Sequence, residues 1–151
     1  MSNIRRIENG SVTSVPGFKA AGVTAGFKRS GAPDFAMIFS EIPADFAGVF
    51  TSCKFAAAPV RYDRELVRKG GKLQAAIINS GNANACTGEA GLRAARESAA
   101  IAGKALKISP DLVAVASTGR IGVQMPMDLV GRGVELAVKQ LSDDGGADAA
   151  R

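Results

Sequence analysis

Histidine is absent from this 151-residue sequence, and its absence narrows the chemistry that the chain can carry out. Neither a Ser-His-Asp or Cys-His arrangement nor an imidazole metal site can be assembled from it. Tryptophan is also absent, and aromatic residues make up only 5% of the chain. The 19 Lys and Arg residues are scattered and form no dense run interleaved with aromatics. The net charge of +5 therefore does not indicate nucleic-acid binding, and an anionic small molecule would suit it equally well.

Cysteine and long apolar runs are scarce too. Cys53 and Cys86 are the two cysteines, and they form no CxxC motif. We interpret them as reduced thiols used as small apolar residues rather than as a disulfide or a nucleophile. The chain has no uninterrupted apolar run of about 18 residues, and its first ten residues lack the apolar core of a signal peptide. We expect a cytoplasmic protein that does not enter the membrane and holds no metal or cofactor.

The composition otherwise suits one folded domain. Hydrophobic residues make up 46% and charged residues 22% of the chain, which is ordinary for a globular protein. We expect residues 1–15 to be irregular. Three short strands are predicted to follow, at Phe18–Lys28, Phe35–Ser40 and Ala47–Ser52. The turn Ile42–Asp45 joins the last two closely, which predicts an antiparallel hairpin.

The stretch Leu73–Gly122 predicts a β-α-β unit. Its apolar runs, Leu73–Ile78 and Leu112–Ala116, are typical of buried strands. Between them, small apolar residues recur at three- and four-residue steps over about 19 residues, which predicts an amphipathic helix. Thr87 suits the N-cap position of that helix. Because a helix joins them, the two strands should run parallel, with a right-handed crossover.

Helical patterns also occur on either side of this unit. A short, charged surface helix is expected over Tyr62–Lys69, and an amphipathic helix from Met127, where Pro126 suits a first turn. The alanine-rich tail after Gly145-Gly146 indicates the start of another helix. This order of strands and helices predicts one layered α/β (α+β) domain over residues 1–151 rather than a doubly wound sheet.

Polar, glycine-bearing turns follow both strands of the unit, where open α/β sheets place their chemistry. In Ser117–Gly122, Gly119 lets the backbone turn and leaves N–H groups bare, and such groups can cradle an oxyanion. The other turn, Asn79–Gly88, offers three candidates for substrate contact: Asn79, Asn82 and Asn84. Each turn also has a structural interpretation, as a plain connection or as a buried loop whose carboxamides satisfy its own polar groups.

Four motifs, taken in order, resemble a known family. They are PGFKAAGVTAGFK, AGVFTSCKFAAAPV, INSGNANACTG and VASTGRIGVQMPMD. Together they resemble the bifunctional ornithine acetyltransferase / N-acetylglutamate synthase family of arginine biosynthesis, over about residues 16–151. The resemblance implies a layered α/β sandwich, shared with a related aminopeptidase. It also implies a precursor that cuts itself before a threonine into an α and a β chain.

The resemblance further implies a transfer of acetyl groups. In the family, the N-terminal threonine of the β chain takes acetyl from N-acetylornithine and passes it to glutamate, and some members also accept acetyl-CoA. The family's oxyanion hole comes from a Thr-Gly pair, which corresponds here to Thr118 and Gly119. An N-terminal threonine can use its own α-amine as the base, which is consistent with a chain that lacks histidine. We therefore expect this chain to work with a β-chain partner, in an α2β2 or higher assembly.

The motifs of the family continue beyond the position of Arg151. An AIMTTD motif, a lysine-bearing segment and the cleavage threonine follow there, so we expect most of an α chain, without the nucleophile. Two alternatives stay open. One is an amidohydrolase or aminopeptidase of the same fold, also with an N-terminal nucleophile, and the other is an inactive α-chain fragment.

Overall fold

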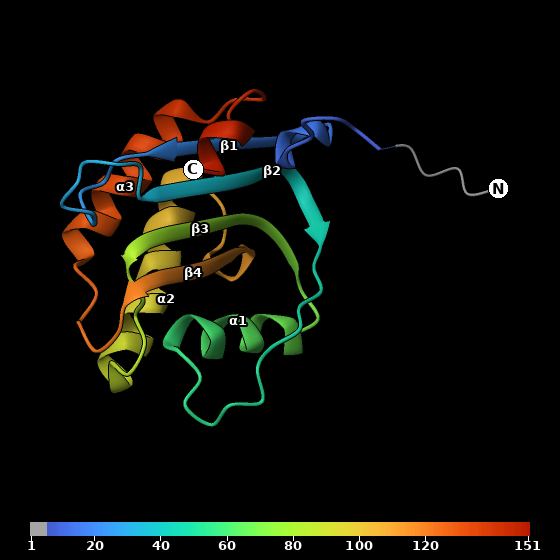
Figure 1. Ribbon diagram of the computed structural model, residues 1–151. Coiled ribbons are helices and arrows are strands. Elements are labelled where there is room, and N and C mark those ends of the chain that lie inside the picture. Colours follow the sequence, from blue (N-terminus) through green and yellow to red (C-terminus); the bar gives the residue numbers. More distant parts are fainter. Residues whose placement is uncertain (1–5) are drawn as a thin grey trace.

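A four-stranded mixed sheet forms the centre of the computed structural model, which describes residues 6–151 (Figure 1). The strands lie in the order β1-β2-β3-β4, and only the β3–β4 pair is parallel. They are β1 (Phe18–Val23), β2 (Phe35–Asp45), β3 (Lys72–Asn82) and β4 (Val113–Arg120). The described helices are α1 (Ala58–Arg68), α2 (Gly88–Leu106), α3 (Met127–Gln140) and α4 (Gly146–Ala149), with short 3-10 turns η1 (Val12–Ser14) and η2 (Pro110–Leu112). The predicted irregular segment lies partly outside the described residues, and its described part contains only η1.

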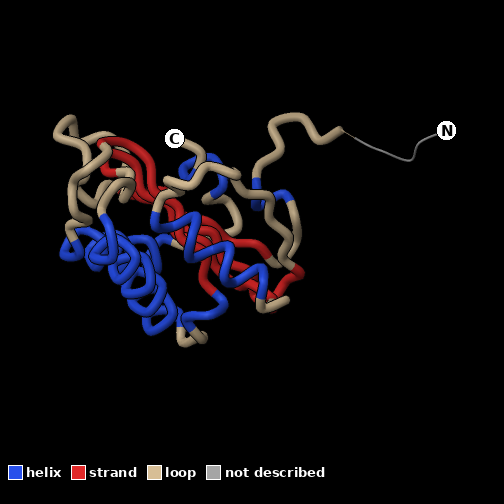
Figure 2. The backbone as a smooth tube through the Cα atoms, turned by 90° about the horizontal axis from the view of Figure 1, so that it is seen from below, coloured by secondary structure: helices blue, strands red, loops and turns tan. Residues whose placement is uncertain are grey.

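The long helices α2 and α3 pack together on one side of the strands (Figure 2). Alternate strand residues point toward this layer, and Met37, Ile77 and Val113 are among those that it buries. On the helix side, Ala95 and Ala99 of α2 are completely buried, and their small side chains let the helix lie close to the sheet. The core therefore lies mainly between the sheet and these two helices, with Ala58, Tyr62 and Leu66 of α1 added to it, as expected of a layered α+β domain.

The β-α-β unit forms as predicted. Strands β3 and β4 run parallel, and the helix between them, α2, has 19 residues. Both strands are longer than predicted and continue into the polar turns, to Asn82 and Arg120. Helix α3 begins at Met127 as expected, whereas α1 begins at Ala58, four residues before the predicted start at Tyr62. The handedness of the crossover stays a prediction.

The first part of the sheet differs from the prediction. Ala47–Ser52 is not a strand, and β1 and β2 form the hairpin instead. Strand β2 runs through the expected turn to Asp45, with a register shift between Phe39 and Ala44. Because β2 lies between β1 and β3, neither of its edges can accept another strand. The chain therefore crosses open surface toward α1, with Val49 fully exposed.

One buried carboxylate holds the loop between β1 and β2. Asp34 is 3% exposed and accepts hydrogen bonds from the N–H groups of Ala25 at 2.6 Å, Gly26 at 3.1 Å and Lys28 at 2.8 Å. Strand β1 consequently ends at Val23 rather than at Lys28, because these N–H groups donate to a side chain instead of a neighbouring strand.

The sheet face opposite α2 and α3 is only partly covered. Helix α4 contacts β1 and β2 on this side, and the N–H and carbonyl of Ser142 pair with Ala20. An apolar groove crosses the rest of the face, and its lining includes Phe18, Ile38, Ala76 and Ala114. Ile38, Ala76 and Ala114 stand opposite one another on β2, β3 and β4, so this second face of the sheet is also partly apolar, although only the other face has a complete helical layer.

Candidate functional site

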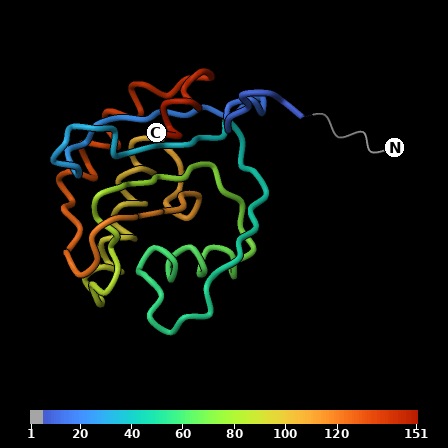
Figure 3. The backbone as a smooth tube through the Cα atoms, in the orientation of Figure 1, coloured from blue at the N-terminus to red at the C-terminus, as the bar shows by residue number. Residues whose placement is uncertain are grey.

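The carboxyl ends of β3 and β4 lie side by side, and the segments that leave them stay in contact (Figure 3). Gly81 of β3 pairs with Gly119 of β4. Beyond the strands, the N–H of Gly122 donates to the carbonyl of Ala85 at 2.8 Å. The two polar turns identified in the sequence therefore form one structure at one edge of the sheet.

Gly119 brings the two strand ends unusually close together. Its φ is +123° and that of Gly81 is +112°, a region of backbone space that favours glycine. A Cβ atom at Gly119 would overlap the carbonyl carbon of Gly81 and approach the N of Asn82 to 2.7 Å. No side chain fits here without a shift of the backbone, so this position requires glycine for both its conformation and its packing.

The backbone N–H groups of β4 alternate between two directions. The N–H of Val115 points away from β3, because it donates to the Asp63 carboxylate of α1, whereas the carbonyl of Arg120 points toward β3 and accepts from Ala83. In a regular strand, this alternation would place the N–H of Thr118 toward β3, where Thr118 pairs with Ser80, and the N–H of Gly119 on the opposite side. We therefore expect the N–H of Gly119, more than that of Thr118, to be bare, and the role of both residues as donors stays a prediction.

The side chain of Thr118 supplies the second available donor. Thr118 and Gly119 are both exposed, and the Thr118 hydroxyl takes part in no hydrogen bond within residues 6–151. The structure therefore presents an exposed hydroxyl on Thr118 beside the exposed Gly119, whose N–H we expect to be the second donor at the end of this edge strand. Two neighbouring donors of this kind are what an oxyanion requires.

The neighbouring residue, Ser117, differs in its surroundings. Its hydroxyl is completely buried and has no hydrogen-bond partner among the described residues. It faces the core side of β4, in a small cavity whose lining includes Asn79 and Ser98. Two adjacent hydroxyls of β4 therefore point in opposite directions, and only the one on Thr118 is exposed.

The three candidate asparagines lie inside the protein. Asn79, Asn82 and Asn84 are 5%, 5% and 1% exposed. Their side-chain amides donate to the carbonyls of Asn82 at 2.8 Å, Val123 at 3.1 Å and Gly91 at 3.1 Å, in that order. This geometry favours the structural one of the two interpretations: Asn79 bonds within β3, Asn82 ties the end of β3 to the loop after β4, and Asn84 ties the loop after β3 to α2.

Thr87 stands at the N-cap position of α2 but does not cap it. Its hydroxyl donates to the side-chain oxygen of Asn84 at 2.8 Å, and no side-chain bond to the first helical N–H groups forms. The prediction of a capping threonine is therefore right in position and wrong in bonding. The hydroxyl thus donates to Asn84, whose own φ is +42°, and accepts from none of the first helical N–H groups.

A family model described as the ArgJ family matches residues 19–151. The chain belongs to the ArgJ family. Among curated members, "Arginine biosynthesis bifunctional protein ArgJ" of Thermosynechococcus vestitus is 48% identical over 151 residues, which is 100% of this chain and 36% of that protein. The protein of the same name from Symbiobacterium thermophilum is 51% identical over 143 residues, which is 93% of this chain and 35% of that protein. The chain thus spans about a third of the length of these ArgJ relatives.

Solved ArgJ-family structures share the fold. An ornithine acetyltransferase from Mycobacterium tuberculosis, complexed with ornithine, superimposes with a TM-score of 0.91 and 42% identity, covering 95% of this chain and 78% of the solved one. The arginine biosynthesis bifunctional protein of Bacillus halodurans gives a TM-score of 0.88 and 40% identity, with 97% and 76% coverage. These matches confirm the fold class and the family predicted from the four motifs.

Both cysteines of this ArgJ-family chain are free thiols, as interpreted from the sequence, but both are exposed. Their use as small apolar packing residues is therefore wrong. Cys86 lines a surface cleft with Lys54 and Arg61, and Arg61 is paired with Glu89 at 3.4 Å. Cys86 also has a positive φ of +56°, which is uncommon for a residue other than glycine.

Sequence reasoning missed Tyr62 and Asp63 of α1, which contact β4 just before the Thr118-Gly119 pair. The segment looked like a charged surface, but Pro59, Tyr62 and Leu66 at three- and four-residue steps form its buried face. Burial raises the pKa of the Asp63 carboxyl from its ordinary 3.8 to about 6, and the N–H of Val115 opposes this shift. Burial also raises the pKa of the Tyr62 hydroxyl, so that it remains a donor.

Proposed function

We propose that this chain is the larger part of the α chain of an acetyltransferase. The enzyme moves an acetyl group from N-acetylornithine to glutamate through an acyl-threonine intermediate on a β chain. The observation that carries the proposal is the exposed Thr118-Gly119 pair, whose Thr118 hydroxyl has no hydrogen-bond partner within residues 6–151, in a chain of the ArgJ family. The M. tuberculosis relative is an ornithine acetyltransferase complexed with ornithine, and this supports an amino-acid substrate of the same kind.

The reaction proceeds in two balanced half-reactions. The β-chain threonine hydroxyl attacks the acetyl carbonyl, the α-amine of the same residue takes the hydroxyl proton, and the proton passes to the ornithine nitrogen as it leaves. The glutamate amine then attacks the acyl-threonine, and the threonine oxygen leaves with the proton. Both steps place a negative charge on the same carbonyl oxygen.

Thr118 and Gly119 stabilise that charge. Each fixed donor of an oxyanion hole contributes about 3 kcal/mol to the transition state, or roughly 100- to 1000-fold in rate. The donors of this chain are held rigidly, because Gly119 packs directly against the backbone of Gly81 and the adjacent loops are tied by buried asparagines. A preorganised pair needs no reorganisation when the charge develops.

A β-chain partner accounts for the part of the relatives' length that this chain does not span, and for the sheet face that α2 and α3 leave uncovered. The chain covers 36% of the T. vestitus protein but 78% of the solved M. tuberculosis chain, a difference that is consistent with a precursor cut into two chains. The apolar groove along Phe18, Ile38 and Ala76 then becomes buried by the second chain. We assign self-cleavage, the β chain and an α2β2 or higher assembly to the proposed enzyme on this basis.

Two further properties belong to the proposal. We assign acetyl-CoA to the enzyme as a second acetyl donor. The relatives are named bifunctional, which is consistent with a second activity. The proposed enzyme uses no cofactor, because acyl transfer runs on side chains alone. We also assign the enzyme to the cytoplasm. Across residues 6–151, no helix combines the length and apolarity that a bilayer span demands.

The test uses the full-length protein. Its intact mass should show two chains, the second beginning with threonine, and N-acetylornithine with glutamate should yield N-acetylglutamate and ornithine. A second arm replaces glutamate with water alone. Release of acetate at the same rate without glutamate would instead indicate an amidohydrolase, and a single uncut chain without transfer activity would contradict the proposal.

A further inference from the structure

Helix α1, not a fifth strand, lies along the edge of β4 (Figure 1). Two consecutive side chains of this helix bond to the strand backbone. The hydroxyl of Tyr62 donates to the carbonyl of Val113 at 3.2 Å, and the carboxylate of Asp63 accepts from the N–H of Val115 at 3.1 Å. One donor and one acceptor thus replace part of the ladder that a neighbouring strand would provide.

We propose that Tyr62 and Asp63 are positioning residues for the acetyl transfer: they fix the edge of β4 and thereby set where Thr118 and Gly119 stand. This inference rests on the proposed function of that pair. Neither residue touches the reacting atoms. Each acts through the backbone of the strand that carries them.

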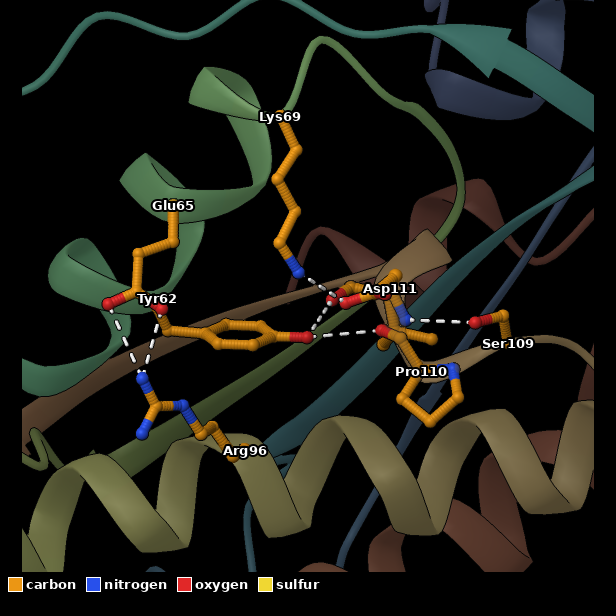
Figure 4. Close-up of polar contacts among 8 residues, drawn as sticks. Tyr62, Glu65, Lys69, Arg96, Ser109, Pro110 and Asp111 are labelled. Carbon is orange, nitrogen blue, oxygen red and sulfur yellow. Dashed lines mark hydrogen bonds and ion pairs between the residues drawn. The ribbon is translucent and has the colours of Figure 1, made fainter.

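The helix that carries these two side chains is itself firmly anchored. The Tyr62 hydroxyl also donates to the carbonyl of Pro110 at 3.0 Å, and Tyr62 is only 6% exposed (Figure 4). Two exposed ion pairs lie on either side of the ring: Glu65 with Arg96 at 3.0 Å, and Lys69 with Asp111 at 3.0 Å (Figure 4). The buried tyrosine provides the main attachment, because exposed pairs contribute little on their own.

The geometry links this attachment to the site. A strand rises about 3.3 Å per residue, so Val115 lies roughly 10 Å before Thr118 on the same edge. The α1 side of β4 holds both the bonded N–H of Val115 and, by alternation, the N–H of Gly119. Loss of the α1 contacts would free that edge, and a misplacement of about 1 Å at a reacting centre can slow a reaction roughly 100-fold.

The experiment compares variants of the full-length enzyme. Tyr62→Phe removes the hydroxyl and keeps the ring, and Asp63→Ala removes the acceptor. Asp63→Asn keeps an oxygen that can accept from Val115 and tests rescue. Arg68→Gln, at an exposed position of the same helix, is the matched control. For each variant, kcat and KM of acetyl transfer are measured together with hydrogen exchange of the amides in β1 to β4.

The inference predicts a loss of kcat with little change in KM. Tyr62→Phe and Asp63→Ala should each lower kcat by about 10-fold and leave KM within about twofold, because substrate contacts are kept while the oxyanion donors are displaced. Exchange should accelerate in β4 and stay unchanged in β1 and β2. Asp63→Asn should recover most of the kcat lost in Asp63→Ala, and Arg68→Gln should match the wild type.

Three contrary results are possible, and they differ in meaning. Wild-type kcat in both Tyr62→Phe and Asp63→Ala, alongside a slow Thr118→Val variant, overturns this inference alone. A similar acceleration of exchange in all four strands also overturns it, because the contacts would then serve general stability. Wild-type kcat in Thr118→Val overturns the proposed function itself.

Discussion

The carboxyl group of Asp63 should make stability depend on pH in an unusual direction. Burial raises its pKa from the ordinary 3.8 to about 6, so the folded protein holds a proton that the unfolded chain has already released. Between these two values folding takes up a proton. The contribution of Asp63 to stability is therefore greatest below pH 4 and is lost as the pH rises through 6.

The size of the effect follows from the shift. A full difference between 3.8 and about 6 would correspond to about 3 kcal/mol. Asp63 is only partly buried, so solvent screening reduces the expected loss to about 1 kcal/mol. Asp63→Asn removes the titration and keeps an acceptor for the N–H of Val115. The wild type and Asp63→Asn should therefore have similar free energies of unfolding at pH 4 and differ in how that free energy changes as the pH rises.

Urea unfolding at pH 4 and pH 7.5 measures this difference. Between the two conditions, the wild type should lose about 1 kcal/mol more than Asp63→Asn, and the other titrating groups cancel because both proteins share them. This chain has no histidine, so no imidazole titrates in the same range. Parallel pH profiles, or a wild type that gains stability relative to Asp63→Asn as the pH rises, would refute the reasoning.

Two further predictions concern the loops around the site. Asp34→Ala should lower the free energy of unfolding by about 3–5 kcal/mol, because three N–H groups of the β1–β2 loop lose their acceptor. Urea unfolding measures this loss, and Asp144→Ala, at an exposed position, is the control. Gly119→Ala should lower the thermal unfolding temperature, because its φ of +123° and its contact with Gly81 leave no room for Cβ. Gly131 lies in α3, and a Cβ added there would meet open space, so Gly131→Ala should instead raise the free energy of unfolding by about 0.5–1 kcal/mol. Equal shifts of the unfolding temperature in the two glycine variants would contradict the steric argument.

The β3-α2-β4 unit could be predicted because its signals are local. The seam of α2 recurs at helical spacing for five turns, and the runs before Asn79 and Ser117 are apolar apart from Gln74, so no distant contact had to be known. The resemblance to the family rested on motifs in the same stretch. The Thr118-Gly119 pair was accessible to sequence reasoning for that reason.

The remaining features depend on contacts between distant segments. Ala47–Ser52 has the composition of a strand, but β2, its expected partner, is already paired on both edges. Whether Thr118 pairs with β3 depends on where β3 ends. The role of Asp63 depends on its bond to Val115 of β4, which lies 52 positions away in the sequence. The asparagines of the loop likewise bond to carbonyls, such as that of Val123, that no local pattern identifies.

The most direct measurement compares the adjacent hydroxyls of β4 in the full-length enzyme. Thr118→Val removes the exposed hydroxyl and Ser117→Ala the buried one that lacks a partner among the described residues, and a rapid-mixing assay follows the first release of ornithine from N-acetylornithine. The account predicts that Thr118→Val slows this release roughly 100-fold or more, whereas Ser117→Ala keeps the wild-type rate. Equal rates in the two variants would contradict the claim that Thr118 stabilises the oxyanion.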